Sequence, residues 1–149
     1  MARHPRWVRA LFSEDDLEAV TRAVAEAERH TSAEIRVHLD HSCKGDVLQQ
    51  AIRIFGRLGM HKTAERHGVL LYISVTDRKL AVIGDKGIHE RVGEAYWRGL
   101  VDAVLPRMRQ RQSREGLIHA LAEVGRELAR HFPRRPDDKN ELSDGVSVG

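Results

Sequence analysis

The chain has a single cysteine, Cys43, among its 149 residues. A lone cysteine cannot close an internal disulfide, so the composition favours a reducing compartment. No Cys or Cys/His spacing suggests a zinc site. No apolar run approaches the roughly 18 residues of a membrane span, and no long apolar stretch follows the basic first residues as it would in a signal peptide. The sequence therefore predicts a cytoplasmic protein without a transmembrane segment.

Aromatic residues make up only 5% of the chain, and the net charge is +3, from 25 basic and 22 acidic residues. Binding to nucleic acid would need clustered basic residues with aromatic rings for stacking, so we do not expect this function. The nine histidines match no helical ligand pair such as His-Glu-x-x-His. The sequence also lacks a phosphate-binding P-loop and a Gly-x-Ser-x-Gly nucleophile elbow.

The most informative stretch of the sequence runs from residue 68 to 93, GVLLYISVTDRKLAVIGDKGIHERVG. Residues 69–75 are nearly continuous apolar residues, which is typical of a central strand covered on both faces. The polar residues 76–79 suit a hairpin turn, so residues 80–83 are predicted to form an antiparallel strand. Asp85 and Lys86 follow between two glycines, and a helical turn is predicted to begin at Ile88.

Residues 34–39 alternate strictly between apolar and polar side chains. The apolar set faces the core, whereas Glu34, Arg36 and His38 form a face that is either wet or holds a buried polar network. Apolar spacing predicts four helices, at 13–30, 46–58, 94–110 and 113–131, with Pro106 kinking or dividing the third. This order predicts an α/β fold: a three-layer α/β/α sandwich with a small mixed β-sheet of three or four strands and about four main helices.

The segments at the two ends of the chain differ from the domain between them, residues 13–133. Residues 1–12 form a basic arm that is expected to fold back on the first helix, where Ser13 and Asp16 match a capping box. A contact with a membrane surface is the alternative for this arm. Residues 134–149 are polar and are predicted to form a flexible tail.

The antiparallel strand decides which loops meet at each end of the sheet. One end gathers Glu34, the loop 60–67, Asp85 and Lys86, and the other gathers Asp40, His41, Asp77 and Arg78. General rules favour the second end, at the carboxyl ends of the parallel strands. We prefer the first end, because it combines a glycine-flanked acid, a helix start and a longer polar loop.

At the preferred end, Glu34 and Asp85 are predicted to supply oxygen ligands for Ca²⁺ or Mg²⁺, although no EF-hand pattern is present. Further ligand-binding side chains are predicted at Thr63, Glu65, Arg66 and Lys86. Two structural alternatives stay open. Glu34 can be a solvated strand residue paired with Arg36, and Asp85 can be a turn former between its glycines.

Several short segments together resemble a known family: TSAEI at 31–35, HKTAERHGVL at 61–70, DRK at 77–79, GDKGI at 84–88, Trp97, HFP at 131–133 and NELSD at 140–144. The chain resembles the TPM domain, named for a thylakoid lumen protein, a photosystem II repair protein and a receptor auxiliary protein. The resemblance covers about residues 12–132. It implies an α/β/α sandwich, with Glu34, Asp85 and the loop 63–66 as site residues.

The resemblance also carries functional expectations. Some plant members are described as acid phosphatases, and some bacterial members bind calcium. Many bacterial members are secreted or membrane-anchored, and some are encoded near LemA-type membrane proteins, which implies a membrane-associated protein partner. Because the sequence shows no evident nucleophile–base pair, we expect a monomeric module that binds a divalent cation or a partner. A weak metal-assisted acid phosphatase is the alternative.

Overall fold

The computed structural model describes residues 4–62, 67–134 and 146–149. Seven longer elements build the body of the domain: α2 (Glu14–Glu28), β1 (Glu34–Asp40), α3 (Val47–Arg57), β2 (Gly68–Ser74), β3 (Lys79–Gly84), α5 (Glu94–Arg109) and α6 (Ser113–His131). Four short elements accompany them: α1 (Arg6–Arg9), the 3₁₀ helix η1 (Met60–Lys62), α4 (Lys86–Val92) and β4 (Ser147–Val148).

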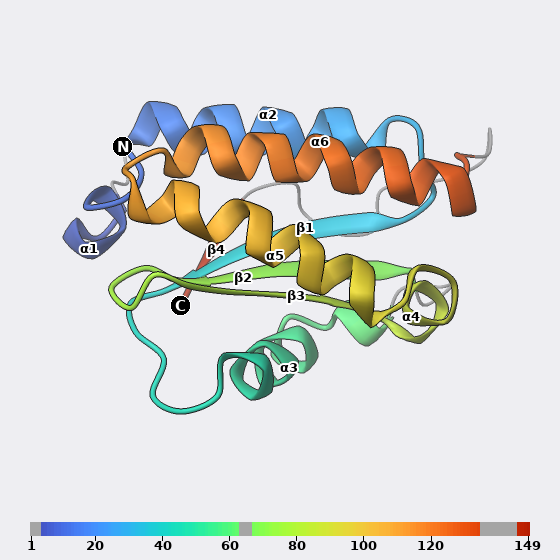
Figure 1. The fold of residues 1–149 in the computed structure, drawn as a ribbon, viewed down its shortest axis with the longest axis horizontal. Coiled ribbons are helices and arrows are strands. Elements are labelled where there is room, and N and C mark those ends of the chain that lie inside the picture. Colours follow the sequence, from blue (N-terminus) through green and yellow to red (C-terminus); the bar gives the residue numbers. More distant parts are fainter. Residues whose placement is uncertain (1–3, 63–66, 135–145) are drawn as a thin grey trace.

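The strands form one mixed sheet in the order β3-β2-β1-β4. β1 pairs in parallel with both β2 and β4, and β2 pairs antiparallel with β3. Helices α2, α5 and α6 lie on one face of this sheet, and α3 lies on the other (Figure 1). The predicted α/β sandwich with a small mixed sheet and four main helices is confirmed.

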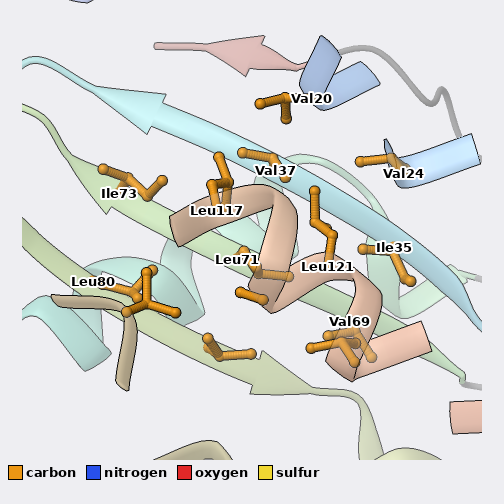
Figure 2. Packing of buried hydrophobic residues seen from close by; sticks show 14 of the residues in the cluster. Val20, Val24, Ile35, Val37, Val69, Leu71, Ile73, Leu80, Leu117 and Leu121 are labelled. Carbon is orange, nitrogen blue, oxygen red and sulfur yellow. The ribbon is translucent and has the colours of Figure 1, made fainter. Parts of the chain in front are cut away.

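Alternation along the strands divides the core into two parts. The larger part lies under α2, α5 and α6 and contains the residues labelled in Figure 2: Val20, Val24, Ile35, Val37, Val69, Leu71, Ile73, Leu80, Leu117 and Leu121. The smaller part lies under α3, where Leu70, Tyr72 and Ala81 meet Ala51, Ile54 and Phe55. All seven residues of β2 are buried, which confirms the prediction of a strand covered on both faces.

The N-terminal arm folds back onto the domain as expected. Val8 on α1 and Phe12 are fully buried in the larger part of the core. The turn into α2 is held by the predicted capping box, in which the Asp16 N–H donates to Ser13 Oγ at 3.0 Å and the Ser13 N–H donates to Asp16 Oδ2 at 2.9 Å. These two bonds satisfy backbone donors that the first turn of a helix leaves unpaired.

Three boundary predictions need correction. Pro106 does not divide α5, which runs unbroken from Glu94 to Arg109 with the proline inside it. Helix α4 begins at Lys86 rather than Ile88. The segment 134–149, expected to be a flexible tail, ends in strand β4, and its residues 135–145 lie outside the described residues. Within the described part of the chain, no helix is long and apolar enough to cross a membrane.

Candidate functional site

The sheet end that the sequence favoured does bring Glu34 and Asp85 near one another. Gly68 of β2 lies between them: it is the register partner of Glu34, and its carbonyl oxygen accepts the Asp85 N–H at 2.8 Å. The Glu34 N–H donates to the His67 carbonyl oxygen at 3.0 Å. Glu34 and Asp85 are each only 6% exposed. Two buried carboxyl residues thus flank a glycine at this end of the sheet.

The structural alternatives for these two residues have different outcomes. Glu34 is buried, so the interpretation as a solvated strand residue is wrong. Asp85 does shape the turn, because its Oδ1 accepts the Lys86 N–H at 2.7 Å and caps α4. Thr63, Glu65 and Arg66 lie outside the described residues. Among the residues that are described, no group of three or more His, Cys, Asp or Glu side chains could hold a metal ion.

A cleft of about 590 Å³ opens beside this end of the sheet, between α3 and α5. Asp85 and Lys86 belong to its lining, whereas Glu34 does not. Two large apolar side chains in the lining are exposed, Leu48 at 41% and Ile52 at 51%. The other lining residues are Val47, Phe55, Leu80, Ala81, Val82, Ile83, Gly84, His89, Glu94, Trp97, Arg98 and Val101.

The cleft follows the edge of β3 rather than one of its faces. The five consecutive residues 80–84 all line it. Leu80 and Val82 pack into the core under α5, whereas Ala81 and Ile83 pack on the α3 side. A cleft on a single face would be lined by alternate residues of the strand. This one therefore straddles the strand, with α3 on one side and α5 on the other.

The backbone of β3 can offer hydrogen bonds to this cleft. Among the strands that the structure describes, β3 is the outermost, and it pairs with β2 on its inner side. The bond from Asp85 N–H to the Gly68 carbonyl oxygen fixes the phase of the antiparallel ladder. In such a ladder alternate residues bond to the neighbouring strand. The N–H and C=O groups of Leu80, Val82 and Gly84 therefore point outward, toward the cleft.

The opposite end of the sheet holds a buried polar network. His38 Nε2 lies 2.9 Å from Asp40 Oδ1, and the Tyr72 hydroxyl donates to Asp40 Oδ2 at 2.7 Å. Gln50 Nε2 donates to the same oxygen at 3.4 Å, and His38 Nδ1 lies 2.7 Å from Ser147 Oγ. His38 and Tyr72 are 2% and 0% exposed. Of the two states predicted for the polar face of β1, the structure shows the buried network.

Burial and hydrogen bonding shift the pKa values of this network in ways that keep Asp40 ionised. Burial alone would raise the pKa of Asp40, but hydrogen bonds from Tyr72, His38 and Gln50 outweigh it and hold that pKa below its usual value. Burial lowers the pKa of His38, although Asp40 opposes this shift. Burial and the hydrogen bond to Asp40 both raise the pKa of Tyr72.

Asp77 lies at the same end of the sheet, as the sequence predicted, and it holds two loops together. Its Oδ2 accepts the Cys43 N–H at 2.7 Å and the Ser74 hydroxyl at 2.8 Å. The hydrogen bond from the Cys43 backbone is the main cause of the lowered pKa of Asp77. Both Asp40 and Asp77 thus have structural partners within the chain.

Sequence reasoning missed the cleft and part of the network. The spacing in the helix 46–58 predicts an inward stripe of Val47, Ala51, Ile54, Phe55 and Leu58. Leu48 and Ile52 are apolar residues off this stripe, and this mismatch is a signal that could have revealed the cleft. Tyr72 was predicted to be buried, but nothing in one sequence identifies Asp40 as its partner. Such pairings depend on the register between strands, which alternation alone does not give.

Comparison with known proteins gives the family. The TPM domain model matches residues 8–127. The NMR structure of the BA42 protein from Bizionia argentinensis superposes with a TM-score of 0.85 and 34% identity, covering 93% of this chain and 95% of that one. N-terminal domains from P. gingivalis and Corynebacterium glutamicum share the fold, with TM-scores of 0.68 and 0.62 at 18% and 13% identity.

The match to the P. gingivalis domain covers 82% of this chain and 79% of that one. The match to the domain of the cg2496 protein from C. glutamicum covers 86% of each chain. No curated protein matches the sequence. The family model spans most of the chain and agrees with the arrangement of the sheet and helices, so this chain belongs to the TPM domain family.

Proposed function

We propose that this TPM domain is a binding module whose ligand is an extended segment of a partner protein, added as a new strand to β3 in the cleft between α3 and α5. The observation that carries this proposal is the lining of the cleft by residues 80–84 in unbroken succession. A peptide laid along this edge meets the outward N–H and C=O groups of β3. Recognition by strand addition draws its affinity from such main-chain bonds and its specificity from side-chain pockets.

The lining of the cleft indicates what kind of segment fits it. Leu48, Ile52 and Phe55 form its α3 side, and Trp97 and Val101 form its α5 side. Both faces of an added strand would therefore meet apolar side chains, so its central residues should be apolar on both faces, as they are in β2.

Charged side chains accompany the apolar lining where β3 ends. Lys86 lies just beyond Gly84 and lines the cleft, as do Glu94 and Arg98 on the first turns of α5. Arg98 and Glu94 form an exposed ion pair with an N–O distance of 3.3 Å. This mixture of charges suits a polar residue at one end of the bound segment. In this proposal Lys86, which the sequence predicts to bind a ligand, lies where the polar end of the bound segment would be.

The composition of the lining favours binding over catalysis. The described lining residues contain no Ser, Thr or Cys that could act as a nucleophile. Asp85 already accepts a hydrogen bond from the backbone of α4. Covalent catalysis by a hydroxyl or thiol needs that group held against a base, and the described lining of the cleft offers no such pair.

The test selects displayed random peptides on the full chain and maps the best binder by NMR. We expect enriched peptides to carry a short apolar run and to shift the amide signals of Leu80, Val82 and Gly84. Amide exchange at these three positions should slow on binding, because the added strand covers their outward N–H groups. Ile52→Arg should abolish binding, since it places a charge on the α3 side of the cleft.

Gln49→Arg is the matched control. Gln49 is exposed on the same helix as Ile52 but does not line the cleft, so this variant should bind the peptide as the wild type does. Equal binding by the two variants would contradict the proposal. Peptides that shift the protein's amide signals on the α2–α6 side of the domain would contradict it as well.

A divalent cation at Glu34 and Asp85 is a second proposal, and it rests on a separate observation. Two buried carboxyl residues flank Gly68 at one sheet end, and hard cations prefer carboxylate oxygens. Thr63 and Glu65 were predicted to complete the coordination shell, and they lie outside the described residues. The corresponding alternative, a weak acid phosphatase that uses this cation, needs the same two carboxylates.

A further inference from the structure

The outer edge of β1 is covered by the last strand of the same chain. Ser147 and Val148 of β4 pair in parallel with His38 and Leu39 of β1. The Gly149 N–H donates to the Leu39 carbonyl oxygen at 3.0 Å. Strand β4, drawn in red in Figure 1, is the neighbour of β1 at the edge of the sheet opposite β3.

Ser147 is the first residue of β4 whose side-chain type is set by its contacts with β1. A carboxylate accepts, so the 2.9 Å contact between His38 Nε2 and Asp40 Oδ1 places the proton of a neutral ring on Nε2. His38 Nδ1 is then an acceptor that needs a donor, and the Ser147 hydroxyl lies 2.7 Å from it. The Val37 carbonyl oxygen competes for the single proton of this hydroxyl at 3.3 Å, and the shorter contact with Nδ1 is the stronger of the two. A hydroxyl-bearing residue is therefore required at this position, because a buried acceptor left without a donor costs about 1–3 kcal/mol.

The second position is Gly149, two residues further along. A Cβ added there would stand 2.7 Å from Asp40 Oδ1 and 2.7 Å from His38 Nε2. Real side chains essentially never approach so closely, and both opposing atoms are held by their own hydrogen bonds. Glycine is therefore required at this position of the paired segment.

The body of the domain holds these opposing groups in place, independently of β4. Asp40 accepts hydrogen bonds from Tyr72 on β2 and Gln50 on α3, and Tyr72 is fully buried. In contrast, β4 is two residues long, and both of its residues are partly exposed. The side chains that face β4 are thus buried and hydrogen-bonded to the body of the domain, whereas β4 itself is short.

We propose that the outer edge of β1 is a second strand-binding seat, specific for the pattern Ser-x-Gly in parallel orientation. Residues 147–149 fill it within the chain, and a partner protein that presents the same pattern in an extended segment competes for it. This inference does not depend on the cleft along β3, which lies at the other edge of the sheet.

The test uses a full-length variant, Ser147→Ala/Gly149→Pro, whose own segment no longer fits the seat. The proline removes the N–H that bonds to Leu39 and adds ring atoms where no Cβ fits. The probe is a fluorescent peptide with the sequence of residues 143–149, SDGVSVG. We expect the variant to bind this peptide in an anisotropy titration. Wild type should bind it at least about ten-fold more weakly, because a tethered segment competes at an effective concentration in the millimolar range.

Two further titrations examine the specificity. A peptide with Ser147→Ala should bind the variant about ten-fold more weakly, which corresponds to about 1.4 kcal/mol for the lost hydrogen bond. Adding His38→Gln to the variant should remove this preference, because glutamine can replace the Nε2 donor to Asp40 but has no acceptor in place of Nδ1. As a control, Ile52→Arg should leave binding of the peptide unchanged. Equal binding of the Ser and Ala peptides by the Ser147→Ala/Gly149→Pro variant that keeps His38 would overturn the proposal.

A measurement on the wild-type chain covers the case in which the variant does not fold. Excess unlabelled peptide is added to ¹⁵N-labelled protein, and the amide signals of Val148 and Gly149 are followed. We expect these signals to move to positions typical of an unfolded chain, while the Leu39 amide signal stays dispersed. Unchanged signals for Val148 and Gly149 at millimolar peptide would overturn the proposal.

Discussion

Gly125 on α6 lies directly against Ala27 on α2. A Cβ added to Gly125 would stand 2.9 Å from the Ala27 Cβ and 3.1 Å from the Ala27 Cα. The second of these atoms belongs to the backbone, so the neighbour cannot move aside without shifting α2. This approach lets α2 and α6 lie side by side over the sheet (Figure 1).

Gly125→Ala should therefore destabilise the domain, although alanine is the better helix former. The gain in helix propensity is about 1 kcal/mol, whereas forcing an extra group into a packed core costs about 1–3 kcal/mol. We expect a net loss of about 1 kcal/mol in the free energy of unfolding, measured by urea denaturation.

Gly56→Ala is the matched comparison on α3, because nothing lies within 4 Å of a Cβ at that position. Only the propensity gain remains, so this variant should be stabilised by about 1 kcal/mol. If Gly125→Ala is stabilised instead, then Gly125 and Ala27 are not in the close contact that leaves no room for a Cβ.

The second prediction concerns stability in acid. Burial and the charges of Arg57 and Arg36 lower the pKa of His38 below 6.5, despite the opposing effect of Asp40. The unfolded chain therefore takes up a proton before the folded chain does as the pH falls through about 6.5. The contribution of His38 to the free energy of unfolding is therefore complete above the pKa of the histidine in the unfolded chain. Below that pKa the contribution falls, by at most about 1.4 kcal/mol per pH unit.

The pKa of Asp40 is also lowered, from 3.8, so a second loss of stability should follow as the pH falls below that value. Urea denaturation of wild type and His38→Gln between about pH 7 and pH 5 tests the histidine. The variant should show a flatter pH dependence, whatever its absolute stability. The matched control is His119→Gln, at an exposed position on α6, which should keep the wild-type slope. The same slope in all three proteins would contradict the assignment to His38.

The third prediction concerns the cation. Titration with Ca²⁺ or Mg²⁺ should shift the amide signals of Glu34 and Asp85 before those of Asp40 and Asp77. Asp85→Asn should weaken the effect, because it removes a charged oxygen ligand and keeps the size and turn preference of the side chain. If the signals of Asp40 and Asp77 respond first, the cation binds at the opposite end of the sheet.

The fourth prediction addresses the phosphatase alternative. Hydrolysis of an aryl phosphate needs a positioned nucleophile and charge stabilisation at the leaving oxygen. We expect only trace hydrolysis by wild type, and an equal trace by Glu34→Gln/Asp85→Asn, with and without added divalent ion. Robust turnover by wild type that the double variant loses would favour the enzyme over the binding module.

Much of the fold follows from local sequence patterns. The apolar run 69–75 predicted the central strand, and the Ser13–Asp16 spacing predicted the capping box. In each case the deciding interactions lie within a few residues of one another along the chain. The juxtaposition of Glu34, Gly68 and Asp85 was also predictable, because one parallel and one antiparallel pairing fix it.

The remaining features depend on contacts between distant residues. Nothing near Ser147 predicts a strand, because its pairing partner His38 is 109 residues away. The preference for the Glu34–Asp85 end of the sheet rested on loop length and glycines, and those features say nothing about the cleft beside it. The cleft arises because α3 and α5 both flank the outermost strand, and the relative placement of two helices is a tertiary property.

Strand β4 also affects how copies of this domain can associate. A sheet with two open edges can stack head to tail, with β3 of one copy against β1 of the next, and such contacts do not close. Here β1 is already paired with β4. Contact through β3 can then join two copies about a two-fold axis, and the resulting pair presents β4 at both of its ends. The last strand thus occupies the part of β1, at His38 and Leu39, that a head-to-tail contact with another copy would use.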